Sequence, residues 1–167
     1  MEKLRVSGIV RESIVDGPGI RFVIFSQGCT HKCVGCHNPQ TFEVSGGYQV
    51  EILDIIKEIK ESPLLDGVTF SGGEPFLQPL SFAKIAEECH RLCLDVICFT
   101  GYTFEELLKM KNNRNIKNLL KNIDILIDGP FILEQRSMLL KFRGSKNQRV
   151  IDVKQSLNND RVLEMDI

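Results

Sequence analysis

The chain has 167 residues, of which 43% are hydrophobic and 26% are charged, and its formal net charge is -1 at pH 7. These values are typical of one soluble globular domain, and they argue against nucleic acid or an anionic membrane as the partner. The chain shows neither an apolar targeting segment at its start nor an apolar run of membrane-spanning length. We therefore expect a single domain over residues 1–167, located in the cytoplasm. Six cysteines in such a chain indicate metal or redox chemistry more than a disulfide framework.

The predicted elements alternate between strands and helices. Short apolar runs predict strands at residues 4–10, 21–26, 67–70, 95–99 and 124–127, with weaker signals at 149–153 and 161–165. Helices are predicted at residues 50–61, 81–93, 103–110 and 116–121. The first helix carries isoleucines at i, i+3, i+4 and i+7 from Ile52 onward, and the third opens with the capping-box pattern Thr103-x-x-Glu106. The alternation predicts a parallel sheet with right-handed crossovers.

A cysteine-rich stretch directly follows the predicted strand at residues 21–26. Residues 27–38 read Q-G-C-T-H-K-C-V-G-C-H-N, so that Cys29, Cys33 and Cys36 have the spacing C-x3-C-x2-C. Iron–sulfur clusters are usually held by four cysteine thiolates, and here no fourth cysteine lies nearby. Three thiolates on one loop could hold three corners of a cubane cluster and leave one iron open, and an open metal position is where chemistry can occur.

The spacing alone leaves other kinds of site open. A zinc ion could be held by the same cysteines together with His31 or His37, because mixed Cys/His tetrahedra are common. A disulfide with one free thiol would require an oxidising compartment. A plain electron carrier would normally have a fourth thiolate. The glycines Gly28 and Gly35 fit a loop that wraps closely around a cluster.

The stretch Ser71-Gly72-Gly73-Glu74-Pro75 is the second informative motif. Two adjacent glycines let the backbone approach a ligand closely and leave their carbonyls available as acceptors. Together with the Ser71 hydroxyl and the Glu74 carboxylate, these carbonyls could bind an ammonium group. The stretch matches neither a P-loop nor a dinucleotide fingerprint. By itself it is more often a turn that ends a strand, but its place one β-α unit after the cysteine loop favours a ligand site.

Four unusual segments each follow a predicted strand. They are the cysteine loop, residues 71–74, Thr100-Gly101 and Asp128-Gly129. In a parallel sheet all four lie at the carboxyl edge, where α/β proteins bind their ligands. The sequence therefore predicts one shared site at this edge.

These motifs carry a resemblance to a known family. The C-x3-C-x2-C loop after one strand, with Gly-Gly-Glu after the next, resembles the radical S-adenosylmethionine enzymes. The stretches at residues 16–21 (D-G-P-G-I-R) and 36–38 (C-H-N) resemble the activases of glycyl-radical enzymes. Three further stretches resemble the activating proteins of anaerobic (class III) ribonucleotide reductases, at residues 100–102, 124–131 and 143–148. The likeness extends over residues 6–153.

The resemblance implies a fold, two cofactors and a reaction. The fold would be an incomplete, TIM-like α/β barrel, with a [4Fe-4S] cluster on Cys29, Cys33 and Cys36 and S-adenosylmethionine on the open iron. Reductive cleavage of S-adenosylmethionine would give a 5′-deoxyadenosyl radical, which makes a glycyl radical on an anaerobic ribonucleoside-triphosphate reductase. A flavodoxin would be the electron donor. An activase of the pyruvate formate-lyase type is the alternative within the class.

By position, the resemblance also assigns residues to S-adenosylmethionine. They are Gly35, Cys36, His37, Ser71, Gly72, Gly73, Glu74, Thr100 and Asp128. Many radical S-adenosylmethionine enzymes have an aromatic residue just before the third cysteine. This chain has Gly35 there, which leaves His37 as a candidate to stack on adenine.

Two further groups of residues carry expectations. Cys89, Cys93 and Cys98 accompany apolar neighbours, so we predict that they are core residues, since free cysteine packs as a small hydrophobe. A basic run lies at residues 141–149. It is either a solvated loop or, through Arg143 and Arg149, a contact with the reductase or with the cofactor carboxylate.

Overall fold

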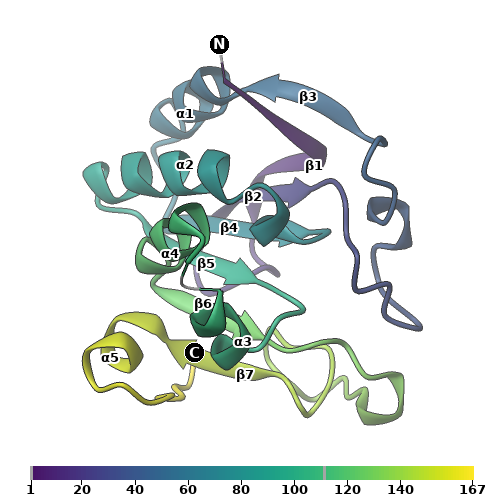
Figure 1. Ribbon diagram of the computed structural model, residues 1–167. Coiled ribbons are helices and arrows are strands. Elements are labelled where there is room, and N and C mark those ends of the chain that lie inside the picture. The colour runs from purple at the N-terminus through teal and green to yellow at the C-terminus, as the bar shows by residue number, and fades with distance from the viewer. Residues whose placement is uncertain (1, 111) are drawn as a thin grey trace.

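A computed structural model describes residues 2–110 and 112–167, and its strands form a single mixed sheet flanked by helices (Figure 1). The strands are β1 (Lys3–Ser13), β2 (Arg21–Ser26), β3 (Tyr48–Glu51), β4 (Gly67–Gly72), β5 (Asp95–Phe99), β6 (Ile125–Asp128) and β7 (Arg149–Asp152). The helices are α1 (Ile52–Lys60), α2 (Pro79–Arg91), α3 (Phe104–Lys109), α4 (Arg114–Lys121) and α5 (Val153–Asn158). Short 3-10 turns lie at Pro39–Thr41, Pro75–Leu77 and Leu133–Gln135.

The strand order is β3-β1-β2-β4-β5-β6-β7. Strands β2, β4, β5 and β6 are parallel, which confirms the prediction for the centre of the sheet. The prediction was wrong at the edges, where β1, β3 and β7 pair antiparallel with their neighbours. The loop between β1 and β2 is too short for a crossover, so these two strands pair antiparallel. The chain that leaves β6 at the carboxyl edge of the parallel strands re-enters the sheet as β7 at that same edge, so β7 pairs antiparallel with β6.

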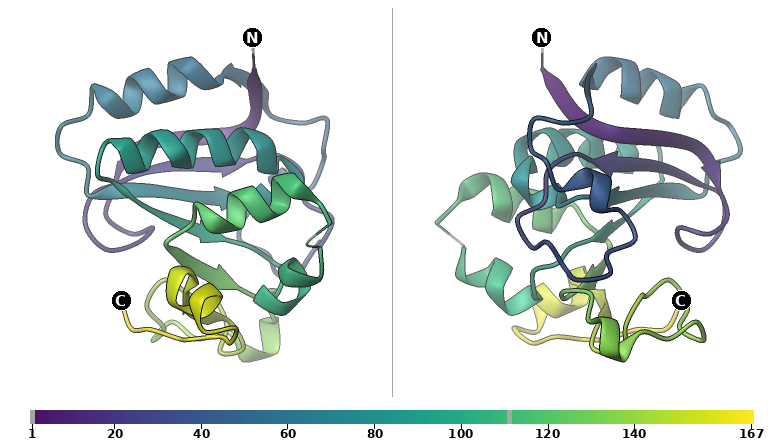
Figure 2. Two further views of the ribbon diagram at one scale, coloured as in Figure 1. Left: turned by 60° about the vertical axis from the view of Figure 1, so that its left-hand side comes forward. Right: turned by 90° about the vertical axis from the view of Figure 1, so that its right-hand side faces the viewer.

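Helices cover one face of the sheet. In both views of Figure 2, α1, α2 and α4 lie together on that face. Alternate residues of the central strands, such as Phe22, Phe70 and Val96, are fully buried in the main core that includes the α1, α2 and α4 side chains. The opposite face carries a smaller apolar cluster around Ile97, Ile127 and Val150. This two-faced burial explains why the central strands are apolar runs without strict alternation.

Several predicted bounds agree with the structure, and others differ. The predicted strands at 21–26 and 95–99 coincide with β2 and β5, and the Thr103 capping box opens α3 with both of its hydrogen bonds formed. Strand β3 lies partly where the first helix was predicted to begin. The weak strand predicted at 161–165 is only an isolated bridge between Ile151 and Glu164.

The core prediction for the cysteines is confirmed for two of the three. Cys89 and Cys98 are buried, and burial raises the pKa of Cys89 to about 12, which leaves an unreactive thiol. The prediction was wrong for Cys93, which is exposed. Helix α2 ends at Arg91, and Cys93 adopts a left-handed conformation with φ 59° in the turn that closes the helix. In that turn Leu94 N–H donates to Cys89 O at 3.0 Å, as in a Schellman motif.

Within the described residues, no helix has the length and apolar character needed to cross a lipid bilayer.

Candidate functional site

A cavity of about 430 Å³ lies at the carboxyl edge of the parallel strands. Its walls come from the cysteine loop after β2, the ends of β4 and β5, and the segment after β6. Most residues predicted from the sequence border it: Cys29, Cys33, Cys36, His37, Ser71, Gly72, Gly73 and Thr100. Gly35, Glu74 and Asp128 are not among its described lining residues. The strand direction thus brings together segments that are far apart in the sequence, since Cys29, Thr100 and Gly129 share the cavity.

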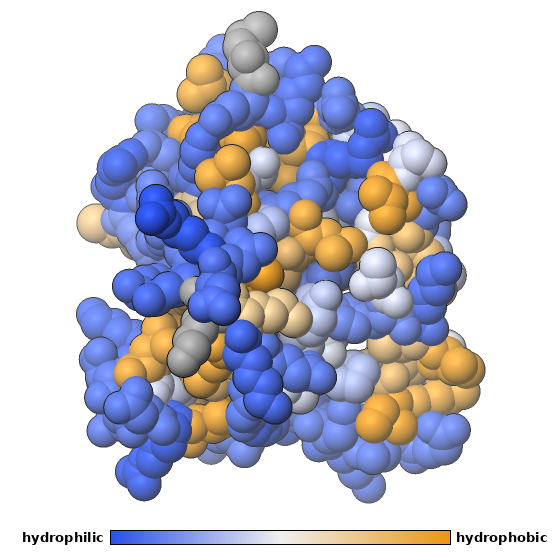
Figure 3. All heavy atoms as spheres, viewed as in Figure 1, coloured by the Kyte–Doolittle hydropathy of each residue, from blue (hydrophilic) through white to orange (hydrophobic). Residues whose placement is uncertain are grey.

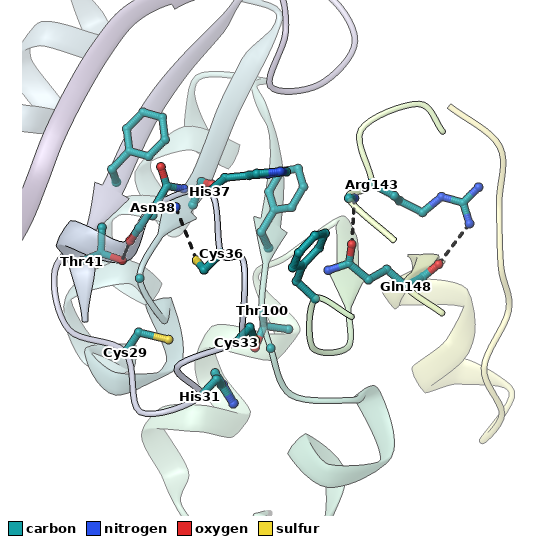
Figure 4. Close-up of a pocket in the computed structure, with 18 of the residues that line it drawn as sticks. Cys29, His31, Cys33, Cys36, His37, Asn38, Thr41, Thr100, Arg143 and Gln148 are labelled. Carbon is teal, nitrogen blue, oxygen red and sulfur yellow. Dashed lines mark hydrogen bonds between the residues drawn. The ribbon is translucent and has the colours of Figure 1, made fainter. Parts of the chain in front are cut away.

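The three predicted cluster cysteines surround a common space. Figure 4 shows Cys29, Cys33 and Cys36 around the interior of their loop. The loop is anchored at its start, where Gly28 N–H donates to Thr41 O at 2.8 Å, and Asn38 N–H donates to the Cys36 sulfur at 3.4 Å. Burial raises the pKa of the Cys29 thiol, while backbone N–H groups of the loop that point at its sulfur oppose the rise.

This arrangement fits an iron–sulfur cluster. No three His, Cys, Asp or Glu side chains in residues 2–110 and 112–167 converge on a point that could hold one metal ion. A cubane does not require convergence, because each thiolate binds a different iron at its own corner. Soft thiolates around one cavity, with backbone N–H groups aimed at sulfur, are the donor set that such a cluster needs.

Glu74 lies behind the cavity wall, not in it. Its carboxylate is fully buried and accepts hydrogen bonds from Phe76 N–H at 3.0 Å and Gly101 N–H at 2.9 Å. The Thr100 hydroxyl also donates to it at 2.9 Å. His31 Nε2 lies 2.7 Å from Glu74 Oε2, and this hydrogen bond raises the pKa of His31. Glu74 therefore connects the cysteine loop to the ends of β4 and β5.

The two glycines before Glu74 have a packing role. Gly72 has φ +89°, and a Cβ there would lie 2.6 Å from the backbone nitrogen of Ser26. A Cβ on Gly73 would overlap the carbonyl oxygen of Gly28. The backbone can therefore run directly against the cysteine loop, where Gly73 N–H donates to Ser26 O and Glu74 N–H donates to Gly28 O, each at 2.8 Å. The same close approach leaves Ser71, Gly72 and Gly73 on the cavity wall.

Asp128 faces the neighbouring helix and strand instead of the cavity. Its buried carboxylate accepts from Phe104 N–H at 2.7 Å, and Arg149 donates to it from Nε at 3.0 Å. Arg149 also pairs with Glu105 at 2.7 Å, and the two carboxylates raise the pKa of Arg149. Because its guanidinium is occupied in this way, Arg149 is not available for the contact with a partner or cofactor that the basic run suggested.

Replacing Arg149 by methionine is expected to lower the free energy of unfolding by about 3 kcal/mol, because it leaves the buried Asp128 carboxylate without its cation. Denaturant unfolding of the apo-protein measures the effect. Lys146→Met is the matched control, because Lys146 is exposed and makes no ion pair among the described residues. Its change should stay within about 0.5 kcal/mol. Equal losses for the two variants would contradict the pairing.

The wall opposite the cysteines comes from the segment after β6. The rings of His37 and Phe131 lie 5.2 Å apart, and a Cβ on Gly35 would lie 2.9 Å from Leu133. Arg143 borders the cavity, but it donates to the Gln148 carbonyl at 3.0 Å, and Figure 4 shows its guanidinium directed away from the cysteines. This geometry does not favour the hypothesis that Arg143 binds the cofactor carboxylate.

The loop between β1 and β2 contributes Asp16 to the cavity. The backbone carbonyl of Asp16 accepts from the Thr69 hydroxyl at 2.9 Å. Arg21 at the start of β2 is fully buried, donates to Thr69 Oγ1 at 3.1 Å and pairs with Asp95. The candidate residues from the sequence included neither Asp16 nor Phe131, although both lie in the stretches 16–21 and 124–131 that carried the resemblance.

The chain is similar to a known protein family and to several known proteins. Residues 15–151 match the protein family described as the 4Fe-4S single cluster domain. The anaerobic ribonucleoside-triphosphate reductase-activating protein of Vibrio cholerae is 37% identical over 144 residues, which cover 81% of this chain and 89% of the relative. The protein of the same name from Haemophilus influenzae is 36% identical over equal shares. The pyruvate formate-lyase-activating enzyme of Clostridium pasteurianum is 40% identical over 114 residues, which cover 63% of this chain and 48% of that enzyme.

Proposed function

Because this chain belongs to the family of anaerobic ribonucleoside-triphosphate reductase-activating proteins, we propose that it activates such a reductase. The chain also contains the 4Fe-4S single cluster domain. The observation that carries the proposal is the cavity in which Cys29, Cys33 and Cys36 meet the glycine turn after β4. With a [4Fe-4S] cluster and S-adenosylmethionine bound there, the site would supply the one-electron reductive chemistry that makes a glycyl radical on the reductase.

The residues of this chain hold and shield the cofactors in the proposal. Cys29, Cys33 and Cys36 hold the cluster, while the Ser71 hydroxyl and the carbonyls of the two following glycines bind the methionine ammonium. The aromatic lining residues shield the cavity from solvent and so limit side reactions of a radical with solutes: Phe25, Phe99, Phe131 and Phe142.

We assign positioning roles to the predicted residues that do not border the cavity. Glu74 acts through His31 and Thr100, because those hydrogen bonds hold the cysteine loop against the sheet. Asp128 acts through Arg149 and the N-terminus of α3. Gly35 acts by letting the cysteine loop approach Leu133.

The remaining expectations are also part of the proposal. The four parallel strands, with helices on one face and the cavity at the carboxyl edge, support an incomplete barrel. We further propose a single domain over residues 1–167, a cytoplasmic location and a flavodoxin as electron donor. The net charge of -1 supports the absence of a nucleic-acid or membrane partner.

Electron paramagnetic resonance of the anaerobically reconstituted, reduced protein tests the function. We expect a [4Fe-4S] signal that changes when S-adenosylmethionine is added, followed by a glycyl radical when the reductase is present. A cluster signal indifferent to S-adenosylmethionine would instead indicate electron transfer. Bound zinc without a cluster signal would make the cysteines a structural site.

The match to a pyruvate formate-lyase-activating enzyme makes that lyase the second candidate substrate. The same measurement separates the two when the chain is offered the reductase and the lyase in parallel. We expect the glycyl radical on the reductase, because the reductase-activating relatives match over 89% of their length and the lyase-activating one over 48%. A radical formed only on the lyase would reverse the assignment.

A further inference from the structure

Residues 131–148, between β6 and β7, form a hairpin-like arm (Figure 1). The arm borders the cavity through residues such as Phe131, Phe142 and Gly144. Arg136 and Ser145 pair as an antiparallel bridge, and Lys146 N–H donates to Gln135 O at 2.9 Å. These contacts give the arm a defined shape, although it contains no regular strand.

Side chains at the base of the arm attach it to the end of β6. Gln148 Nε2 donates to Gly129 O at 3.1 Å, and Asn147 Nδ2 donates to Pro130 O at 2.8 Å. The stretch at residues 143–148 (R-G-S-K-N-Q) is therefore attached to the end of β6, and this attachment holds Gly144 in the cavity wall. The arm consequently occupies a fixed position relative to the cavity.

The tip of the arm is apolar and faces solvent. Met138 is 84% exposed and Leu139 is 94% exposed, the two highest exposures among the large apolar side chains of the described residues. Leu133 on the arm and Val34 on the cysteine loop are exposed as well, and Val15 is both exposed and part of the cavity lining. Figure 3 shows apolar side chains gathered at the lower right, over the arm. Single exposed apolar residues are ordinary, but a group beside a cavity marks an interaction surface.

The arm also carries an excess of positive charge. Arg136, Lys141 and Lys146 are exposed, and none of them forms an ion pair within the described part of the chain. Glu134 is the only exposed carboxylate on the arm. An apolar tip surrounded by unpaired cations is complementary to an apolar depression edged by carboxylates.

We propose that Met138 and Leu139 dock the glycyl-radical reductase, in an apolar, acidic-edged depression next to the segment that carries the target glycine. The inference rests on the proposed function. A cavity of about 430 Å³ admits only a short peptide segment, so the body of the reductase must rest on the cavity rim. The arm is the most exposed apolar part of that rim, and docking there aligns the glycine segment with the cavity.

The double variant Met138→Ser/Leu139→Ser tests the proposal in the full chain. We expect the Kd for the reductase, measured anaerobically by interferometry, to rise about tenfold or more, because truncation of central apolar contacts has effects of this size. Reductive cleavage of S-adenosylmethionine by dithionite without reductase should be unchanged, since neither side chain borders the cavity. A second variant, Arg136→Glu/Lys141→Glu, should weaken binding and reduce its salt dependence.

The matched control is Leu53→Ser/Leu64→Ser, which removes two exposed leucines from α1 and the loop before β4. Its Kd should stay within about twofold of wild type.

An unchanged Kd for the arm variant would overturn the proposal, as would a wild-type chain that does not bind the reductase. The proposal would also be overturned if, without reductase, the arm variant sedimented differently from the wild-type chain. The arm would then bind a second copy of this chain and not the reductase. If the wild-type chain binds the reductase but forms no glycyl radical, the proposed function fails and the docking surface stands.

Discussion

Serine in place of Cys33 is expected to abolish cluster assembly and, with it, all glycyl-radical formation. Serine offers a hard oxygen donor where iron–sulfur clusters are held by soft thiolates, so the loop would retain only two thiolates, Cys29 and Cys36. Cys33 is partly exposed and lies in a loop, so the fold itself should survive the change. Iron and acid-labile sulfide content after anaerobic reconstitution, together with the spectrum of the reduced protein, measures the effect.

Cys93→Ser is the matched control for this loss. Cys93 is exposed in the turn after α2 and lies outside the cavity. The same atom replacement should leave iron content and radical yield within about twofold of wild type, as for most surface substitutions. A Cys33→Ser protein with the iron content, reduced spectrum and radical yield of the wild type would show that Cys33 is not a cluster ligand, and the assignment of three thiolates would be wrong.

Replacing Glu74 by alanine is expected to lower the free energy of unfolding by about 3–5 kcal/mol, the range found when one partner of a buried charged pair is removed. The substitution leaves the N–H groups of Phe76 and Gly101 and the hydroxyl of Thr100 buried without their acceptor. It also releases His31, and with it the cysteine loop. Denaturant unfolding of the apo-protein measures the first effect, and hydrogen exchange at residues 29–38 measures the second.

Two further variants separate this positioning role from direct cofactor binding. Glu74→Gln keeps the shape and one acceptor oxygen but turns an amide NH₂ toward existing donors, so a smaller loss of about 1–3 kcal/mol is expected. His31→Ala should speed hydrogen exchange in the cysteine loop, with less effect on global unfolding because His31 is only partly buried. If Glu74→Ala changed only the affinity for S-adenosylmethionine, the carboxylate would be the ammonium ligand that the sequence predicted.

The elements that local sequence determines were predicted closely. Strands β2 and β5 are continuous apolar runs bounded by turn residues, and the Thr103 capping box specifies where α3 begins. Strand β3 was missed because Tyr48–Glu51 has only four residues and directly precedes the isoleucine pattern of α1. It is a strand only through pairing with β1, more than forty residues earlier. A register of that kind leaves no local signal.

The sequence by itself determined which atoms could do the chemistry and at which edge they lie. The spacing of Cys29, Cys33 and Cys36 and the glycine pair after β4 are local patterns, and strand direction alone brings them to one rim. Only the tertiary structure decided which way the side chains face. The carboxylates of Glu74 and Asp128 are directed away from the cavity by hydrogen bonds to His31 and Arg149. These partners lie 43 and 21 residues away in the sequence, so no local pattern indicates the pairing. A charged side chain is buried only where a partner pairs with it. Because that partner is distant in the sequence, the orientation of the side chain follows from the fold and not from the motif.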